Sequence, residues 1–347
     1  MIKAGIIGGT GYAGQELVRL LLEHPDVDIS FISSSSNFGR DYLELYMNYY
    51  HRMNIECIET PTNIIDFDID VLFIALPHGH SSNLLSKEIL EKMRVIDLGA
   101  DFRLTNVDVY NQWYNSNHPT PDLIDSAVYG LCELNREAIR KTNLIANPGC
   151  YTTCSILSLA PLVINSLIDL DSIVIDAKSG ITGAGRSLSL STHYSECNEN
   201  MNSYNPLGHR HTPEIEENLS LLAGQKIQLS FVPHLIPVNR GILTTIYCKP
   251  NQLLNYDRIR DAFIDAYGND KFIRLLPKGI PAETKWVKGS NYIDIGVFLD
   301  ERTNQIIITS ALDNLIKGAA GQAVQNMNIM FELKEETGLD RVSMFPV

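Results

Sequence analysis

The chain has 347 residues, 44% of them hydrophobic and 20% charged, and a formal net charge of −13 at pH 7. This length and composition predict a soluble globular protein with two domains, and the acidic balance argues against nucleic acid or an anionic membrane surface as a partner. No apolar run is long enough to span a membrane, and the N-terminus lacks the charged region and cleavage site of a signal peptide. Six scattered cysteines predict free thiols in a reducing compartment, so we expect a cytoplasmic protein.

A glycine-rich turn follows the first predicted strand, Ile2 to Ile7, and leads directly into a helical pattern. Its glycines follow the spacing G-x-x-G-x-x-G, which differs from the dinucleotide fingerprint G-x-G-x-x-G but meets the same needs: a tight turn and close approach of the backbone to a pyrophosphate. The strand–turn–helix context predicts a nucleotide site rather than a merely tight turn. The expected cofactor contacts in this turn are Gly8, Thr10, Gly11, Tyr12, Ala13 and Gly14.

The second predicted strand, residues 27–32, ends in the run Ser33 to Ser36, with Arg40 close behind. An NAD enzyme places an acidic side chain here to bind the ribose 2′-hydroxyl, whereas hydroxyl groups and a cation suit a 2′-phosphate. The pattern therefore favours NADP over NAD, and a polar loop without a ligand is the alternative. The expected contacts are Ser33, Ser36 and Arg40.

Two further strands end in polar residues. The apolar run at 71–76, typical of a strand buried on both faces, leads into Pro77 and a pair of histidines, and the strand at 95–98 leads towards Arg103. Because open α/β sheets bind ligands at the carboxyl ends of their strands, the first stretch would line the cofactor crevice or cap the next helix. Arg103 could fork a phosphate or carboxylate, or pair with a neighbouring aspartate. Residues 106–126 are predicted to cross the surface as a loop.

Cys150 follows a strand-like run at 144–146 and a Pro–Gly turn, and an amphipathic helix follows it. A cysteine in the first turn of a helix is close to unpaired N–H groups and to the positive end of the helix dipole, which favour a thiolate. The residue is therefore a candidate nucleophile for an acyl carbon, and a buried core cysteine is the alternative.

His209 and His211 lie just before another predicted helix, with Thr212 as its N-cap and Pro213 at its first position. In extended backbone both imidazoles would project to one side, where one could activate a thiol and protonate a leaving oxygen. A zinc site is the alternative, but its spacings match no standard structural pattern, so we expect no metal. Its ligands would be Cys150, Cys154, His209 and His211.

The second half contains predicted strands with few helices between them, which indicates a mixed or antiparallel sheet. We expect an α/β chain with a Rossmann-type dinucleotide-binding domain at 1–148 and an α+β catalytic and oligomerisation domain at 149–312. The helical segment 313–347 would return to the first domain. The predicted strands of the second half are 173–177, 227–232, 242–249, 272–275, 292–299 and 306–311.

The chain resembles the N-acetyl-γ-glutamyl-phosphate reductase family nearly from end to end. It departs at Thr152, where the family often has proline, and in the loop before the two histidines, and these departures affect only the expected shape of the pocket. The resemblance rests on Gly8–Gly14, Leu76–Ser81, Asp97–Arg103, Asn147–Thr153, Asp176–Arg186, Gly208–Ile215, Phe231–Gly241 and Gly318–Asn326.

The resemblance implies a semialdehyde dehydrogenase-like fold and the NADPH-dependent reduction of N-acetyl-L-glutamyl 5-phosphate to N-acetyl-L-glutamate 5-semialdehyde and phosphate, in arginine biosynthesis. Cys150 would form a thioester, with His211 as the acid–base group and His209 in support. The implied substrate contacts are Arg103, Asn147, Lys178, Ser179 and Glu214, and Pro77, Gly318 and Gln322 join the cofactor contacts.

Three other readings remain open. A sister reductase of lysine biosynthesis acts on N-acetyl-aminoadipyl phosphate or a carrier-linked equivalent, although Tyr151 favours the arginine enzyme. Aspartate-semialdehyde dehydrogenase is more distant, because its cysteine and histidine motifs differ. A non-catalytic NADP-binding sensor would have no use for Cys150. The β-rich second domain predicts a homodimer or homotetramer.

Overall fold

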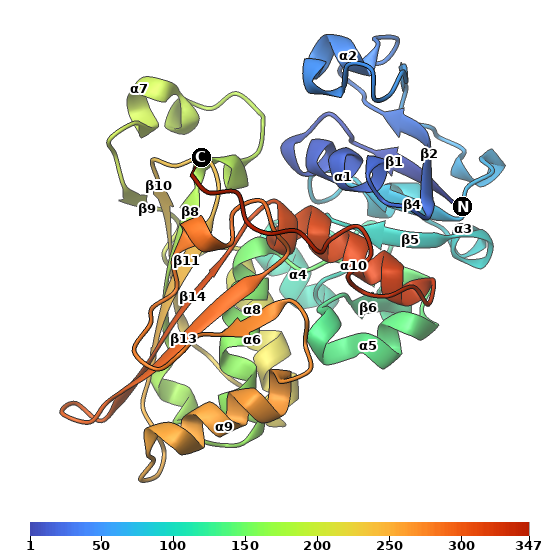
Figure 1. The fold of residues 1–347 in the computed structure, drawn as a ribbon. Helices are drawn as coiled ribbons and strands as arrows, with labels where there is room; N and C mark the ends of the chain where they lie inside the picture. The colour runs from blue at the N-terminus through green and yellow to red at the C-terminus, as the bar shows by residue number, and fades with distance from the viewer. Residues whose placement is uncertain (347) are drawn as a thin grey trace. The chain divides into compact units, whose positions relative to one another are not determined.

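The computed structural model describes residues 1–346, which divide into two compact units (Figure 1). Unit 1 comprises Met1–Pro148 and Ala319–Asp340, and unit 2 comprises Gly149–Gly318 and the C-terminal residues from Arg341 onward. The chain therefore leaves unit 1, forms most of unit 2, and returns to unit 1 through its last long helix. Within residues 1–346, no helix combines the length and apolar character needed to cross a membrane.

Unit 1 is built on a fully parallel seven-stranded sheet with the order β3-β2-β1-β4-β5-β7-β6. Its central strand β4 is buried along its whole length, as the apolar run predicted. This sheet confirms the predicted Rossmann-type domain. The strands are β1 (Ile2–Ile7), β2 (Val27–Ser33), β3 (Cys57–Ile58), β4 (Val71–Ile74), β5 (Arg94–Asp97), β6 (Ala127–Tyr129) and β7 (Leu144–Ala146).

The surface loop predicted at 106–126 contains a helix of unit 1. Residues 106–126 are not simply a loop, because α4 begins after Asn106, whose side-chain oxygen accepts the backbone N–H groups of Asp108 (2.9 Å) and Val109 (3.2 Å). This cap satisfies donors that a short helix start leaves unpaired. The helices are α1 (Tyr12–Leu22), α2 (Tyr42–Leu45), α3 (Lys87–Lys92), α4 (Val107–Tyr114), α5 (Cys132–Lys141) and the fully buried α10 (Gly321–Met330).

Unit 2 contains a mixed seven-stranded sheet with the order β12-β13-β14-β11-β8-β10-β9. β8 pairs with β10 in parallel, whereas β11 pairs with both β8 and β14 in antiparallel fashion. The predicted mixed sheet and the α+β character of this half are thereby confirmed. The strands are β8 (Val174–Gly180), β9 (Asn202–Ser203), β10 (Ser230–Ile236), β11 (Ile242–Cys248), β12 (Ile273–Leu275), β13 (Ile293–Asp300) and β14 (Gln305–Leu312).

Helix α6 lies on one face of this sheet, which we call the inner face. Buried polar side chains join them: Cys154 Sγ lies 3.4 Å from Ser310 Oγ of β14 and 3.6 Å from Thr244 Oγ1 of β11, and Ser158 Oγ lies 2.6 Å from Ser310 Oγ. Burial raises the pKa of Cys154 to about 11, so this second cysteine of the helix stays a thiol at neutral pH. The helices of unit 2 are α6 (Cys150–Ile164), α7 (Tyr194–Cys197), α8 (His211–Ala223) and α9 (Tyr256–Tyr267).

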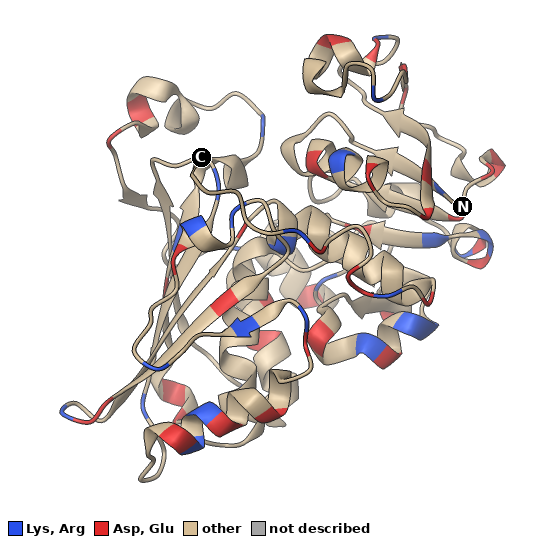
Figure 2. Ribbon diagram, in the orientation of Figure 1, with Lys and Arg blue, Asp and Glu red and all other residues tan. Residues whose placement is uncertain are grey.

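Charged residues are distributed unevenly over unit 2 (Figure 2). Helix α9 carries acidic and basic side chains along its length, whereas β11 and β14 contain no Lys, Arg, Asp or Glu. The outer face of the sheet, opposite α6, therefore has central strands without charge. This asymmetry bears on how copies of the chain associate.

Candidate active site

Cys150 is the first residue of α6, and Gly149 precedes it in extended backbone (φ −68°, ψ 156°) as the N-cap. The predicted order of strand, Pro–Gly turn and helix is confirmed. The side chain of Cys150 is only partly buried, while Tyr151 to Val163 are buried. The thiol therefore remains accessible at the end of the helix that favours a negative charge.

Glu214, in the first turn of α8, closes the N-terminus of α6. Its Oε1 accepts hydrogen bonds from the backbone N–H of Gly149 (2.9 Å) and from the hydroxyl of Thr152 (2.9 Å). Glu214 is 1% exposed, and a carboxylate at a helix N-terminus is favoured by the helix dipole. The structure thus places Glu214 as a support of the helix that carries Cys150, and its role in substrate binding stays a prediction.

His209 and His211 come together, with their rings 4.8 Å apart and the ring of Tyr151 5.7 and 5.9 Å away. The expected cap was wrong: α8 begins at His211, so Thr212 and Pro213 lie inside its first turn, where proline is tolerated because those N–H groups have no partner within the helix. The N-cap position is Arg210, whose side chain makes no capping hydrogen bond, and the backbone N–H of His211 donates instead to Nδ1 of His209 (3.1 Å).

The environment of His209 keeps its imidazole neutral. Burial lowers the pKa of His209 to about 3, and the charges of His211 and Arg210 act in the same direction. Its ring lies 5.4 Å from that of Tyr204 and 5.3 Å from that of Phe231. Because Nδ1 accepts a hydrogen bond, the ring proton belongs on Nε2. These features favour His211 as the histidine that moves protons.

Lys178 and Ser179 follow each other on β8, so their side chains point to opposite faces of the sheet. Ser179 is buried on the inner face, beside α6. Lys178 is on the outer face, where it forms an ion pair with Asp176, and Asp176 also lies 3.2 Å from Nδ1 of His234. The structure therefore brings Ser179, but not Lys178, to the side of the sheet that α6 covers. Substrate binding by either stays a prediction.

The glycine turn of unit 1 has the geometry of a phosphate cradle. Gly8 has φ +78°, and a Cβ on Gly14 would lie 2.3 Å from the carbonyl oxygen of Gly8. A Cβ on Gly9 would lie 2.4 Å from Ile32 Cγ2, whereas one on Gly11, the N-cap of α1, would meet only the Gly8 oxygen, at 3.7 Å. Gly8, Gly9 and Gly14 are thus required for the turn, and Gly11 leaves space in front of the helix N-terminus.

The hydroxyl groups beyond β2 divide into buried and exposed ones. Ser34, which the sequence analysis did not select, lies with its Oγ 2.7 Å from Thr10 Oγ1 in the glycine turn. Ser33 is fully buried, whereas Ser36 and Arg40 are exposed. Arg40 forms an exposed ion pair (2.9 Å) with an acidic residue one turn further on. Contact of Ser33, Ser36 or Arg40 with a 2′-phosphate stays a prediction.

Three tyrosines that the sequence analysis did not select form hydrogen bonds with the backbone of the glycine turn and of the helix that follows it. Their hydroxyls donate to backbone carbonyls in and just after the turn, so those carbonyls have partners within the protein. The spacing i, i+4 and i+7 indicates one helical face, but no local pattern reveals the distant acceptors. The pairs are Tyr42 to Gly9 (2.9 Å), Tyr46 to Thr10 (2.8 Å) and Tyr49 to Gln15 (3.0 Å).

Asp101 fixes the loop that follows β4 and begins with the exposed Pro77. Its carboxylate accepts the backbone N–H groups of Gly79 (2.6 Å) and Ser82 (3.0 Å) and the hydroxyls of Ser81 (2.9 Å) and Ser82 (2.8 Å). Burial acts to raise the pKa of Asp101, but these hydrogen bonds hold it below its ordinary value. The loop is therefore held by a carboxylate that stays ionised at neutral pH.

Asp97, at the end of β5, shares Ser81 with Asp101: Ser81 Oγ lies 3.1 Å from Asp97 Oδ2. Burial, followed by the charge of Asp101, raises the pKa of Asp97 to about 7 from 3.8. Between these values the folded chain binds a proton that the unfolded chain releases, so the free energy of unfolding falls as pH rises through this interval and stays low above it.

Replacing Asp97 by asparagine should remove this pH dependence. The Oδ1 of the introduced asparagine can still accept the Gly99 N–H (2.8 Å in the native protein), and its amide can donate to Ser81. We expect the difference in unfolding free energy, variant minus native, to increase by about 1–3 kcal/mol between pH 5 and pH 8. Urea unfolding at several pH values from 5 to 8 measures this difference, and Asn in place of the exposed Asp28 is the control. If the unfolding free energies of the native protein and Asp97→Asn changed in parallel with pH, the prediction would be contradicted.

Two predicted substrate contacts in unit 1 form hydrogen bonds with other residues of the protein. Arg103 is 9% exposed, and its Nη2 donates to the carbonyl of Leu98 (2.9 Å). Asn147 is 1% exposed; its Nδ2 donates to the carbonyl of Ala319 (3.1 Å), and its Oδ1 accepts from Asn326 Nδ2 (3.2 Å). Asn147 thus joins β7 to the segment before α10, and the substrate roles of both residues stay predictions.

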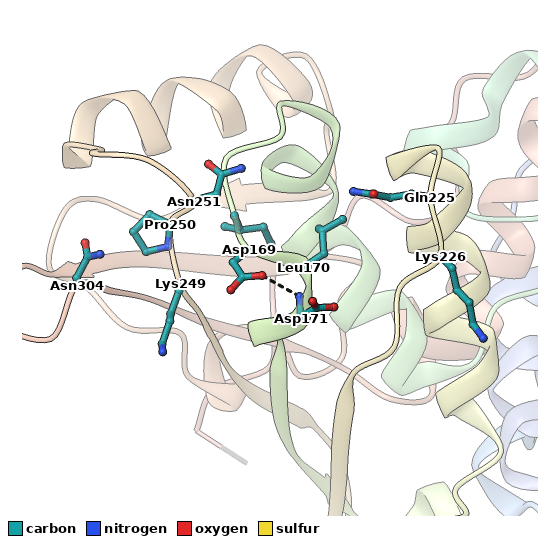
Figure 3. Close-up of a pocket in the computed structure, with 10 residues that line it drawn as sticks. Asp169, Leu170, Asp171, Gln225, Lys226, Lys249, Pro250, Asn251 and Asn304 are labelled. Atoms are coloured by element: carbon teal, nitrogen blue, oxygen red, sulfur yellow. Dashed lines mark hydrogen bonds between the residues drawn. The ribbon is translucent and has the colours of Figure 1, made fainter.

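A pocket of about 490 Å³ at the surface of unit 2 lies apart from these residues (Figure 3). Its polar side chains include Lys226, Lys249, Asn251 and Asn304, which are exposed to solvent. None of the predicted site residues lines it.

Comparison with known proteins agrees over both halves. The model described as "Semialdehyde dehydrogenase, NAD binding domain" matches residues 3–142, and that described as "Semialdehyde dehydrogenase, dimerisation domain" matches 150–314. The N-acetyl-gamma-glutamyl-phosphate reductase of Lachnoclostridium phytofermentans is 50% identical over 100% of both chains. That of Campylobacter jejuni (serotype O:2) is 53% identical over 97% of this chain and 98% of its own. The chain belongs to the N-acetyl-gamma-glutamyl-phosphate reductase family.

Solved structures agree with the fold of this reductase family. Aspartate semialdehyde dehydrogenase II of Vibrio cholerae has a TM-score of 0.71 at 18% identity, covering 96% of this chain and 99% of its own. The Candida albicans aspartate semialdehyde dehydrogenase, solved with NADP, has a TM-score of 0.67 at 17% identity, covering 95% and 99%. At these identities the likeness establishes the fold, so the predicted semialdehyde dehydrogenase-like architecture is confirmed.

NADP(H), the cofactor of this reductase family, fits features of unit 1. The glycine turn forms the cradle described above, and Gln322 of α10 is fully buried with Nε2 donating to Gly130 (2.7 Å). Its Oε1 has no hydrogen-bond partner in the part of the chain that the structure describes, so an acceptor remains for a ligand. Gly318, also predicted to contact the cofactor, belongs to unit 2 and packs against Cys150. Within residues 1–346 no cluster of His, Cys, Asp and Glu is arranged to hold a metal ion.

Proposed function

We propose that the chain catalyses the NADPH-dependent reduction of N-acetyl-L-glutamyl 5-phosphate to N-acetyl-L-glutamate 5-semialdehyde and phosphate, in arginine biosynthesis. The observation that carries this function is the full-length identity of 50% to a reductase of that name, together with Cys150 at the N-terminus of α6. The two features support both the overall reaction and its covalent route.

The thiolate of Cys150 would attack the acyl carbon of the substrate. A carbon–sulfur bond forms, the carbon–oxygen bond to the phosphate breaks, and phosphate leaves with the electron pair. NADPH, when bound, supplies the hydride that reduces the thioester carbonyl. The resulting hemithioacetal loses the Cys150 thiolate and yields the aldehyde.

Proton transfer is assigned to His211. It would take the thiol proton of Cys150 before attack, and it would protonate the oxygen that becomes negative when the thioester is reduced. The same proton returns to His211 when the hemithioacetal collapses, because its hydroxyl becomes a carbonyl as the Cys150 thiolate leaves. His209 would fix the backbone of His211 through the bond to Nδ1 (3.1 Å), and Glu214 would hold the helix that carries the nucleophile.

The remaining substrate contacts are proposed for Arg103, Asn147 and Ser179, whereas Lys178 points to the opposite face of β8. A guanidinium group would bind the phosphate or the carboxylate of the substrate, which the net charge of −13 otherwise repels. Ser33, Ser36 and Arg40 are proposed to bind the 2′-phosphate of NADPH. The binding partner of the chain would then be its small-molecule substrate, an acyl phosphate.

The reverse reaction tests the function. N-acetylglutamate semialdehyde, phosphate and NADP are supplied, and NADPH formation is followed by its absorbance. We expect formation to depend on phosphate and to be faster with NADP than with NAD. N-acetylaminoadipate semialdehyde, run in parallel, tests the lysine-pathway reading. Binding of NADP without turnover on either aldehyde would instead support a sensor.

We further propose that the chain forms a homodimer through the outer face of the unit 2 sheet, or a tetramer built from such dimers. Val174, Tyr247, Ile307 and Phe298 are neighbours across four strands on this face and are all partly or largely exposed. The description of the matching domain as a dimerisation domain supports this assignment. Burying such a row is favourable, because apolar surface leaves water.

Replacing Ile307 by glutamate should weaken that dimer, because a charge would enter the centre of the apolar row. We expect the dissociation constant to rise at least about 100-fold, measured by light scattering over a dilution series. Leu253→Glu is the matched control, since Leu253 is 99% exposed in a loop and should change nothing. An unchanged mass for Ile307→Glu at every concentration would exclude this face.

A cytoplasmic location is proposed as well. The reaction requires Cys150 as a thiol, and none of the six cysteines, all within the described residues, forms a disulfide. A reducing compartment preserves this state.

A further inference from the structure

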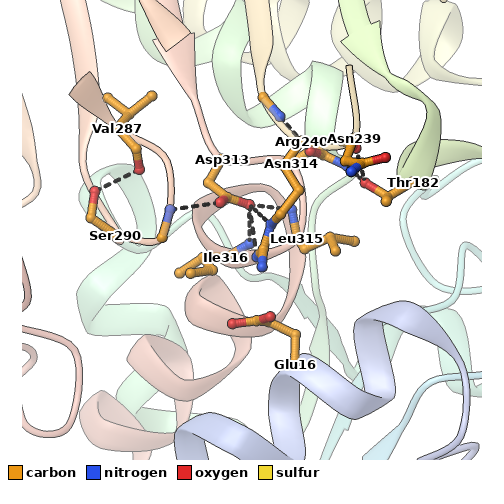
Figure 4. A network of polar contacts seen from close by, with 12 residues as sticks. Glu16, Thr182, Asn239, Arg240, Val287, Ser290, Asp313, Asn314, Leu315 and Ile316 are labelled. Carbon is orange, nitrogen blue, oxygen red and sulfur yellow. Dashed lines mark hydrogen bonds and ion pairs between the residues drawn. The ribbon is translucent and has the colours of Figure 1, made fainter. Parts of the chain in front are cut away.

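Asp313, the residue after β14, holds an unusually complete set of donors with a fully buried carboxylate (Figure 4). Its Oδ1 accepts the backbone N–H groups of Leu315 (2.9 Å) and Ile316 (3.2 Å) and lies 3.1 Å from Nη2 of Arg240. Its Oδ2 accepts the backbone N–H of Gly289 (2.8 Å). Each of these contacts is a donor, so both oxygens act as acceptors and a group that donates does not fit in their place.

The same residue fixes the turn that lies against the nucleophile. The carbonyl oxygen of Asp313 accepts the backbone N–H of Gly318 (3.0 Å). A Cβ on Gly318 would lie 2.7 Å from the Cβ of Cys150 and 3.2 Å from its Cα, with the Asp313 oxygen at 3.3 Å. The backbone of Gly318 is therefore the surface against which Cys150 packs, and Asp313 closes the turn from 313 to 318 that presents it.

The carboxylate also connects this turn to other segments of unit 2. Gly289 follows the short helix at Thr284–Trp286, and the C-terminal tail lies on this loop: Met344 N–H donates to Lys288 (2.9 Å), and the Phe345 ring lies 5.0 Å from Trp286. Arg240 comes from the turn between β10 and β11. One buried charge thus holds three segments that are far apart in sequence, which specifies a single arrangement.

We propose that Asp313 is a positioning residue for Cys150. It acts through Gly318: the carboxylate holds the turn, the turn places the Gly318 backbone, and that backbone sets the direction in which the thiol leaves the first turn of α6. The effect on turnover rests on the proposed function, whereas the effect on the thiol itself does not. A displacement of about 1 Å at a reacting group can lower a rate about 100-fold.

Asp313→Asn tests the proposal, because its amide group would face the donors of Gly289 or Leu315. Asp294→Asn is the matched control: Asp294 on β13 is 2% exposed and bonds Arg274 Nε (2.5 Å) and Nη2 (3.0 Å), a similar buried pair without contact to Gly318. For each variant we would measure Tm, kcat, the KM for NADPH and the rate at which iodoacetamide modifies Cys150, resolved by peptide mass spectrometry.

We expect Asp313→Asn to lower kcat about 10- to 100-fold, to leave the KM for NADPH within twofold, and to change the alkylation rate of Cys150 at least about fivefold. Asp294→Asn should lower Tm by a similar amount while kcat and alkylation stay native-like. Equal kcat and alkylation rates in both variants would overturn the proposal and leave Asp313 a structural residue only.

Gly318→Ala provides a second route if Asp313→Asn does not fold. The added methyl group would lie 2.7 Å from the Cβ of Cys150, which is too close, so Cys150 must move. The alkylation rate of Cys150 and kcat should therefore both change, while the hydrogen bonds of Asp313 remain. Native-like alkylation of this variant would also overturn the proposal. Alkylation needs no turnover, so a native chain that reacts at Cys150 but reduces no acyl phosphate would refute the proposed function and leave the positioning role standing.

Discussion

Replacement of Cys150 by serine should lower kcat at least about 1000-fold in both directions of the reaction. A serine hydroxyl at the N-terminus of α6 keeps the shape of the site, but it ionises far less readily than a thiol, and no ester forms at a comparable rate. Binding of NADPH should be unchanged, because the glycine turn belongs to unit 1. The measurement is phosphate-dependent NADPH formation, with cofactor binding followed separately by fluorescence titration.

Cys197→Ser is the control for this prediction. Cys197 is a partly buried cysteine of the short helix α7 and should tolerate serine with little loss of activity. Cys154 is less suitable, since its thiol belongs to the buried network with Thr244 and Ser310, and its replacement would also change stability. Substantial turnover by Cys150→Ser would show that the reaction does not pass through a thioester on this residue.

The features that sequence predicted well are those decided within a few residues. The Pro–Gly turn before Cys150 and the glycine turn after β1 both carry their own conformational requirements, so strand, turn and helix follow from local order. The sheets could also be predicted, because alternating or continuous apolar runs indicate which strands are buried on one face or on both. Even the mixed character of the second sheet followed from the scarcity of helices between its strands.

The supports of these features could not be predicted, because each joins distant segments. Glu214 reaches the N–H of Gly149 from 65 residues away, and Tyr42 reaches Gly9 from 33 residues away. A local pattern even misled at α8, where Thr212 looked like the cap. The N-cap position is Arg210, and the N–H of His211 donates to the imidazole of His209, an acceptor that ordinary capping preferences do not include.

The alternation of strand side chains would have improved one assignment. Lys178 and Ser179 were both predicted as substrate contacts from the family resemblance, yet neighbours on a strand point to opposite faces. The sequence already contained this constraint. The face of the sheet that carries the nucleophile is the face on which α6 packs. The structure identifies this face through the contacts of Cys154 and Ser158 with Ser310.

The two histidines should respond very differently to replacement. His211→Gln is expected to lower kcat about 100- to 10,000-fold, because it removes the proposed proton carrier. His209→Asn should lower it no more than about tenfold, since the asparagine oxygen can still accept the backbone N–H of His211 and so retain the start of α8. Steady-state kinetics of both variants, with Tm as the check on folding, gives the comparison.

The pH dependence of kcat/KM distinguishes the two roles independently of these magnitudes. With its pKa lowered to about 3, His209 is neutral from pH 5.5 to 9.5 and contributes no ionisation in that range. His209→Asn should therefore keep the native profile at a lower height, whereas His211→Gln should lose one of its limbs. If His209→Asn removed a limb instead, the protonated form of His209 would have to exist near neutral pH despite its burial among aromatic rings. The assignment of the acid–base group would then pass from His211 to His209.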